Sequence, residues 1–206
     1  MRRRKFIGIC IGLAAGWPLA ALAEETAIPI IGYLSSKGPA AEATTVDAVR
    51  AGLAQNGFIE GRNVAIEFRW SDGNYERLPA LAAELVDRKV RVLLTSGLPA
   101  TFAAQKATQR IPIVFRLAVD PVAFGLVQNL SRPGGNLTGV TMLFDPLTPK
   151  KLQLLHELIP GATSVGFLIN PRNPNATSHR QYAEAATRSM GLRVTMLSAG
   201  NPAELA

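Results

Sequence analysis

Short apolar runs alternate along the chain with longer segments in which apolar residues recur at helical spacing. Ile28–Ser36 and Val90–Gly97 are continuous apolar runs that end in small polar residues, as is typical of strands buried in a parallel sheet. From Ala40 to Asn56 the spacing is helical, and Gly57 provides a C-terminal cap. Further strands are predicted at 63–70, 111–120, 137–141, 164–170 and 192–199, and further helices at 75–90, 99–108, 122–130, 146–160 and 174–190. This alternation predicts an α/β fold, with a parallel sheet sandwiched by helices.

The best candidate for a domain boundary is the segment "LFDPLT", Leu143–Thr148. Five predicted strands precede it, and a new series of strands and helices begins after it. We therefore expect a first α/β lobe over residues 24–143 and a second over residues 144–206.

The N-terminus has the composition of an export signal. Arg2–Lys5 are basic, Phe6–Leu22 are almost wholly apolar, and Ala21–Ala23 offers a small-residue cleavage site. A retained anchor is the alternative, but a bilayer span needs roughly 20 apolar residues and a proline interrupts this run. The pair Arg3-Arg4 also resembles a twin-arginine signal, for which an ordinary Sec signal is the alternative. We predict that residues 1–23 are a cleaved signal peptide and that the mature protein is periplasmic.

Charge and cysteine content exclude several classes of function. The net charge is +7, but four positive charges lie in the predicted signal, which leaves +3 for the remainder. A charge this small and dispersed does not indicate a nucleic-acid partner. The single cysteine, Cys10, also lies in the signal, so the mature chain would have no disulfide, thiol nucleophile or thiolate metal site.

Polar residues gather where the predicted strands end. In a parallel sheet, small ligands bind at the carboxyl ends of the strands, where the following helices point their free amides. Hydroxyl, carboxylate and amide groups at this edge would hydrogen-bond a small polar solute, and they belong to Ser35, Ser36, Thr95, Ser96, Asp120, Thr141 and the asparagines of 170–175. The alternative is that each group caps a helix or forms a turn.

Motifs for catalysis or cofactor binding are absent from the sequence. It contains no nucleophile elbow and no zinc-protease, dinucleotide or Walker motif, and His156 and His179 do not have metal-ligand spacing. Gly134-Gly135-Asn136 precedes a predicted strand rather than a helix, so it lacks the helix N-terminus of a phosphate loop. We interpret it as a tight turn that requires positive φ. The sequence therefore predicts no catalytic residue, no metal and no cofactor.

Several long segments resemble one family: "TSGLPATFAAQKAT", "DPVAFGLVQNLSRPGGNLTGVT", "KKLQLLHELIP" and "NPRNPN". From about Ile28 onward, the chain resembles the ABC-transporter substrate-binding proteins, in the group that includes tryptophan- and tyrosine-type binding proteins. The resemblance implies a type I periplasmic-binding-protein fold, in which two lobes joined by a hinge close on a solute. It implies reversible capture and not an enzyme.

The resemblance also implies a site and partners. The solute would be a small, amino-acid-like organic molecule, and the partner an ABC permease in the membrane that receives it. Leu143–Thr148 would be the first hinge crossing. The ligand-facing loops fall on ten positions of this chain: Ser35, Ser36, Ser96, Pro99, Ala100, Asp120, Pro121, Thr141, Asn170 and Asn173.

Two features depart from the family pattern. Arg116 and Leu117 stand where family members more often carry small or uncharged residues, so the pocket is expected to favour an acidic group unless Arg116 is an exposed strand-end residue. The chain ends at Ala206, where the second lobe would be incomplete, as in a fragment or a functional short form. A periplasmic sensor partner would use the same closing lobes and is an alternative to transport. An exported α/β hydrolase is a further alternative, but the sequence shows no clustered nucleophile and base.

Overall fold

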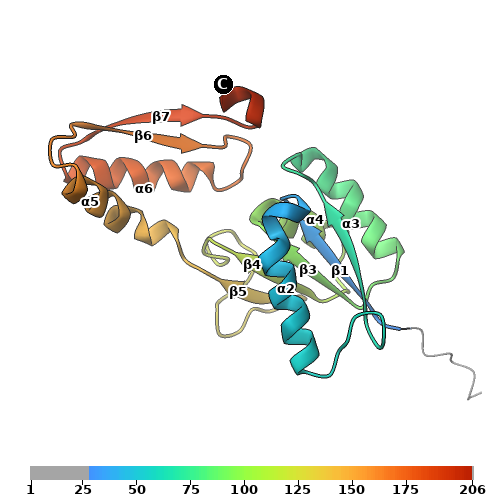
Figure 1. The fold of residues 1–206 in the computed structure, drawn as a ribbon. Coiled ribbons are helices and arrows are strands. Elements are labelled where there is room, and N and C mark those ends of the chain that lie inside the picture. The colour runs from blue at the N-terminus through green and yellow to red at the C-terminus, as the bar shows by residue number, and fades with distance from the viewer. Residues whose placement is uncertain (1–27, 206) are drawn as a thin grey trace, which may run out of the picture.

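The computed structural model describes residues 28–205, which form two α/β units (Figure 1). The first unit contains a five-stranded sheet and the second a two-stranded sheet. The predicted signal peptide, residues 1–23, lies outside the described residues. Within residues 28–205, no helix combines the length and the apolar character that a membrane crossing needs.

The first unit alternates strands and helices as the apolar pattern predicts. Neighbouring strands are all parallel, in the order β2-β1-β3-β4-β5, which confirms the predicted parallel sheet. The strands are β1 (Ile30–Ser35), β2 (Ala65–Trp70), β3 (Val92–Ser96), β4 (Ile113–Leu117) and β5 (Leu137–Thr141). The helices are α2 (Pro39–Gln55), α3 (Leu78–Asp87), which follows the 3-10 turn η1 (Tyr75–Arg77), and α4 (Leu98–Ala107).

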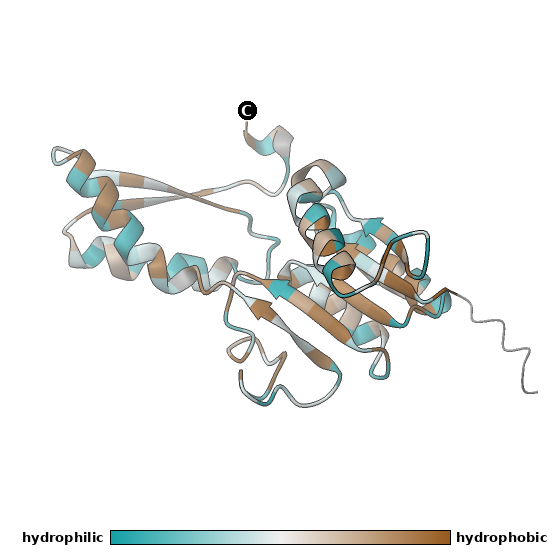
Figure 2. Ribbon diagram, turned by 60° about the horizontal axis from the view of Figure 1, so that its bottom comes forward, coloured by the Kyte–Doolittle hydropathy of each residue, from teal (hydrophilic) through white to brown (hydrophobic). Residues whose placement is uncertain are grey.

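Helices cover both faces of the five-stranded sheet, because successive side chains of a strand point to opposite sides. Leu34 of β1 belongs to the buried core that the sheet shares with α3 and α4, together with Leu85 and Leu93. Its neighbour Tyr33 faces the other way and donates a hydrogen bond to Glu42 of α2. The hydropathy colouring shows largely apolar strands in this sheet and helices in which polar and apolar residues are mixed (Figure 2).

The helix predicted at Val122–Leu130 is wrong, since the segment forms a series of turns. Gly125 has a φ of 67°, which a helix does not allow, and its N–H donates to Val122 O. The N–H groups of Leu126 and Val127 both donate to Pro121 O, so no helical ladder forms. Leu126 and Val127 are buried in the core, and this burial explains the apolar pattern that suggested a helix.

The tight turn predicted at Gly134-Gly135 is confirmed, with φ values of 72° and 63°. Directly before the turn, a hydrogen bond of 2.9 Å from Gln128 N to Pro133 O closes the preceding loop. Directly after the turn, the Asn136 side-chain amide donates to Ile111 O at 2.8 Å. The turn therefore fixes where β5 begins beside β4.

The second unit contains two parallel strands, β6 (Ser164–Ile169) and β7 (Arg193–Ser198), packed on helices. Its helical elements are η2 (Asp145–Leu147), α5 (Thr148–Leu158), α6 (Ala176–Ser189) and η3 (Pro202–Leu205). Leu168 and Leu197 are 56% and 50% exposed, so one face of this small sheet is uncovered within the described residues. The chain enters the unit between β5 and α5, where the sequence predicts the hinge. That hinge and its exact boundary stay predictions.

Candidate functional site

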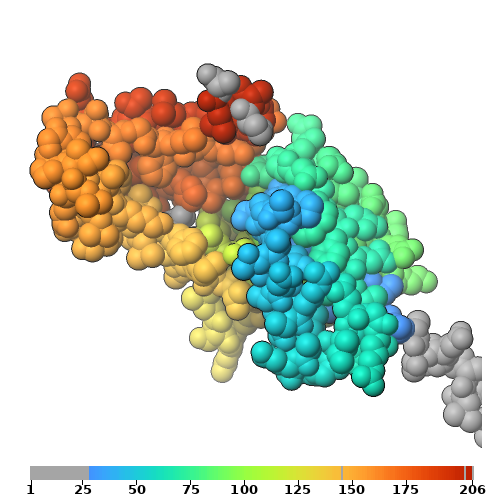
Figure 3. Space-filling model, viewed as in Figure 1, coloured from blue at the N-terminus to red at the C-terminus, as the bar shows by residue number. Residues whose placement is uncertain are grey.

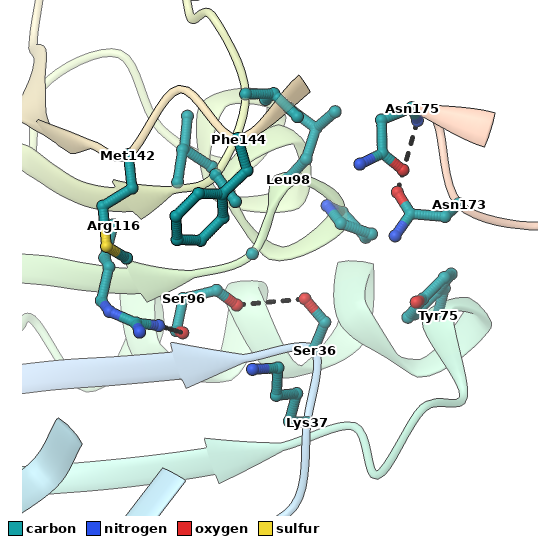
Figure 4. Close-up of a pocket in the computed structure, with 15 residues that line it drawn as sticks. Ser36, Lys37, Tyr75, Ser96, Leu98, Arg116, Met142, Phe144, Asn173 and Asn175 are labelled. Carbon is teal, nitrogen blue, oxygen red and sulfur yellow. Dashed lines mark hydrogen bonds between the residues drawn. The ribbon is translucent and has the colours of Figure 1, made fainter. Parts of the chain in front are cut away.

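A cavity of about 240 Å³ lies where the carboxyl ends of β1, β3 and β4 face the loop that follows β6 (Figure 4). In the space-filling view the second unit meets the first along one side (Figure 3). This volume is just below the range of about 300–1,000 Å³ that is typical of ligand pockets, so the cavity suits only a small solute. Its polar lining comes from both units and comprises Ser36, Lys37, Tyr75, Ser96, Arg116, Asn173 and Asn175.

The floor of the cavity is the junction between β1 and β3. Ser36 donates twice to Ser96 O, from its backbone N–H at 3.1 Å and from its hydroxyl at 3.0 Å. The Ser71 hydroxyl donates to Ser36 O from beneath. Gly97 follows with a φ of 94°, and a side chain at this position would meet Ser36 Oγ. A glycine is therefore needed for the two serines to come together.

We expect Gly97→Ala to lower the free energy of unfolding by about 1–2 kcal/mol, because it adds a Cβ at positive φ against Ser36. Urea denaturation measures the change. Gly161→Ala is the matched control, since nothing lies within 4 Å of the added carbon, and it should stay within about 0.5 kcal/mol of the wild type. Equal stability of the two variants would contradict the description of this junction.

One side of the cavity is apolar and open to solvent. Leu98 is buried at the start of α4, whereas Met142 and Phe144 are 42% and 43% exposed. Phe144 N donates to Ala118 O at 3.2 Å, which holds this segment beside the end of β4. An apolar part of a solute would displace water from these side chains.

The opposite side of the cavity comes from the loop after β6. Asn173 Oδ1 accepts from Asn175 N at 3.3 Å, and the Asn175 side chain contacts His179 Nε2 at 3.1 Å. Burial raises the pKa of Tyr75, and the nearby Asn173 amide acts in the opposite direction. Tyr75 precedes α3 in the first unit, so these residues join the two units at the cavity.

Four of the ten residues predicted to bind solute line this cavity: Ser36, Ser96, Pro99 and Asn173. They come from three segments that lie far apart in the sequence, the end of β1, the junction of β3 and α4 and the loop after β6, and the fold brings them together. Their role in binding stays a prediction.

The other six predicted residues, Ser35, Ala100, Asp120, Pro121, Thr141 and Asn170, do not line the cavity. Ser35, Ala100 and Pro121 are buried, and the Ser35 hydroxyl accepts from Lys37 N. Asp120 and Asn170 accept hydrogen bonds from backbone N–H groups two residues further on, and Thr141 donates to Val119 O. The side chains of Ser35, Asp120 and Asn170 thus bond within local turns, as in the alternative that the sequence left open, whereas Thr141 links the end of β5 to the segment that follows β4. Their role in binding also stays a prediction.

Several cavity residues were not predicted from the sequence: Lys37, Tyr75, Leu98, Met142 and Phe144. Lys37 directly follows the serine pair, which marked its position along the chain, whereas Asn175 was expected as one of the asparagines of 170–175. Tyr75 had no local signal, because only the packing of the loop before α3 against the second unit brings it to the cavity.

Within residues 28–205, no group of three or more His, Cys, Asp and Glu side chains is placed to hold a metal ion. Hydrogen-bonding and apolar groups instead dominate the cavity, together with two basic side chains. The arrangement can bind a small solute from two sides.

Comparison with known proteins identifies the family. Residues 30–206 match the family described as ABC transporter substrate binding protein. The curated "Tyrosine-binding protein" of Clostridioides difficile (strain R20291) is 32% identical over 125 residues, which are 60% of this chain and 35% of that protein.

Solved structures support the same fold. A conserved domain protein from Vibrio cholerae has a TM-score of 0.80 at 27% identity, covering 87% of this chain and 60% of that one. An ABC domain in complex with L-Trp from Streptococcus pneumonia has a TM-score of 0.76 at 23% identity, covering 86% and 59%. This chain thus spans about 60% of the solved relatives and 35% of the curated one. The sequence match and the shared type I periplasmic-binding-protein fold confirm the resemblance, and the chain belongs to the ABC transporter substrate-binding protein family.

Proposed function

We propose that this protein is the extracytoplasmic solute-binding component of an ABC importer. It captures a small, amino-acid-like organic solute between its two units and delivers the solute to a membrane permease. Residues 1–23 direct its export to the periplasm and are then removed. The protein binds reversibly and catalyses no reaction.

The observation that carries this proposal is the position of the cavity. It lies at the carboxyl ends of parallel strands, the usual ligand site of open α/β sheets, and both units contribute polar side chains to it. A solute that contacts Ser96 from one side and Asn173 from the other would favour the closed arrangement over the open one. Such a difference in affinity is what ligand-driven closure requires.

The relatives support the proposed class of solute. The curated relative is named for tyrosine, and its 32% identity extends over 60% of this chain. The segment of Leu143–Thr148, between the two units, is our proposed hinge, because it connects the five-stranded sheet to the helices of the second unit.

Titration calorimetry with the twenty amino acids and related organic acids tests this function. We expect saturable binding of one solute per chain. Ser96→Ala and Asn173→Ala should each weaken it by about tenfold, because each removes a hydrogen-bonding group worth about 1.4 kcal/mol in an enclosed site. Thr138→Ala is the control, since this exposed threonine on β5 lies outside the cavity.

The proposal fails if no solute binds, or if Ser96→Ala and Asn173→Ala bind as the control does. A loss confined to Ser96→Ala would contradict capture between two units, because Asn173 is the contribution of the second one.

A further inference from the structure

The cavity has an unbalanced charge. Two cationic side chains, Lys37 and Arg116, lie among the described residues that line it, and no carboxylate does. What the cavity attracts therefore depends on whether each cation already has a partner.

Lys37 is already paired. Its Nζ lies 3.4 Å from Oε1 of Glu42, whose side chain is completely buried. The Tyr33 hydroxyl donates to the other carboxylate oxygen at 2.7 Å. Burial alone would raise the pKa of Glu42, but the hydrogen bond from Tyr33 and the charge of Lys37 hold it below its usual value. Glu42 is therefore an anion at neutral pH, and it balances the charge of Lys37.

Arg116 has no such partner. Among the side chains that the structure describes, no carboxylate lies within ion-pair distance of its guanidinium. Nη1 instead donates to Ser96 Oγ at 3.4 Å, and Figure 4 shows the guanidinium beside Ser96 at the cavity. Arg116 is half-buried, and it pairs with Ser96 in the register of β3 and β4.

A half-buried guanidinium at a cavity is suited to one class of ligand group. Its planar donors match the two oxygens of a carboxylate, and the loss of water around it strengthens the pairing. A ligand ammonium finds no comparable partner here, because the lining offers only hydroxyl, amide and backbone acceptors. The neighbouring Leu98, Met142 and Phe144 would contact an apolar body.

We infer that Arg116 binds a carboxylate of the solute, and that the cavity selects organic carboxylates with an apolar body while an ammonium group adds nothing to affinity. The inference rests on the proposed function, since it names the class of solute for the same cavity. It assigns Arg116 as the residue that determines specificity.

Calorimetry with two matched trios of probes tests the inference on the exported protein. The aromatic trio is 3-(4-hydroxyphenyl)propanoate, L-tyrosine and tyramine, and the aliphatic trio is 4-methylpentanoate, L-leucine and 3-methylbutylamine. Within at least one trio, we expect the carboxylate to bind at least as tightly as the amino acid and the amine not to bind. Arg116→Gln should weaken carboxylate binding by about tenfold or more, and Arg116→Lys by less, because lysine keeps the charge without the planar donors.

Arg110→Gln is the matched control, since Arg110 is exposed, precedes the same strand and lies outside the cavity. It should bind the carboxylate as the wild type does, and urea denaturation should show all variants folded. If a probe binds but Arg116→Gln leaves its affinity unchanged, or if the amine of a trio binds best, the inference is overturned and the proposed function stands. If no member of either trio binds, the inference is overturned, and the calorimetric screen of the twenty amino acids and related organic acids decides the proposed function separately.

Discussion

Gly139→Ala is expected to lower the free energy of unfolding by about 3 kcal/mol or more, since the added carbon would overlap backbone atoms. Gly139 pairs with Phe115 in the register of β4 and β5. A Cβ at Gly139 would meet Phe115 O and would lie 2.7 Å from Phe115 N. Backbone atoms cannot rotate away as a side chain does, so the two strands would have to separate.

The separation of the two strands should also change the cavity, because β5 supports one of its sides. At the end of this strand, Thr141 Oγ1 donates to Val119 O at 2.6 Å, and directly after it Met142 N donates to Leu117 O at 3.0 Å. Separation of β5 from β4 would release both contacts. We therefore expect Gly139→Ala to lose solute binding together with stability.

Urea denaturation followed by circular dichroism measures the effect of Gly139→Ala. Gly52→Ala in α2 is the control, because nothing lies within 4 Å of its added carbon. It should keep the stability of the wild type or gain up to about 1 kcal/mol, as alanine favours helix over glycine. A Gly139→Ala protein as stable as the wild type would contradict the β4–β5 pairing.

Glu42→Ala is expected to cost about 2–3 kcal/mol, because it removes the partner of a buried hydroxyl. Tyr33 is 3% exposed, and its hydroxyl donates to Glu42 at 2.7 Å. Removal of the carboxylate leaves this hydroxyl without an acceptor and Lys37 without its counter-charge. Glu42→Gln keeps an acceptor for Tyr33 and should cost less.

The pH dependence of stability separates the charge of Glu42 from its hydrogen bond. The pKa of Glu42 is lower in the folded protein than its ordinary value of 4.5. Its charge therefore contributes full stability above pH 4.5, and this contribution is lost as the pH falls through the folded pKa. The stability difference between wild type and Glu42→Gln should narrow on acidification below pH 4.5.

Urea denaturation at pH 7 and at steps down to pH 3 measures this difference. Asp47→Asn serves as the control, since its side chain is 76% exposed, and it should change stability by no more than about 0.5 kcal/mol at any pH. A constant gap between wild type and Glu42→Gln across this range would show that the Glu42 charge does not stabilise the fold.

The sequence by itself determined the α/β fold and the family. Continuous apolar runs such as the one that became β1 can be satisfied only by burial on both faces, and helical spacing marked α2, α3, α5 and α6. Positive φ at Gly134 and Gly135 also followed from the sequence, because few other residues adopt it. These features depend on local geometry and on burial, which a linear pattern records.

The tertiary structure alone decided which polar residues line the cavity. Asp120, Thr141 and Asn170 lie at strand ends, as Ser36 and Ser96 do, but their side chains bond to nearby backbone groups. Burial explains the apolar pattern at Val122–Leu130. The segment nevertheless forms turns, because the positive φ of Gly125 and the hydrogen bonds to Pro121 O prevent a helix. Tyr75 and Asn175 reach the cavity only because the second unit packs against the end of the first sheet. The sequence pattern indicates which residues are buried but not where their side chains point, and a binding site depends on where the side chains point.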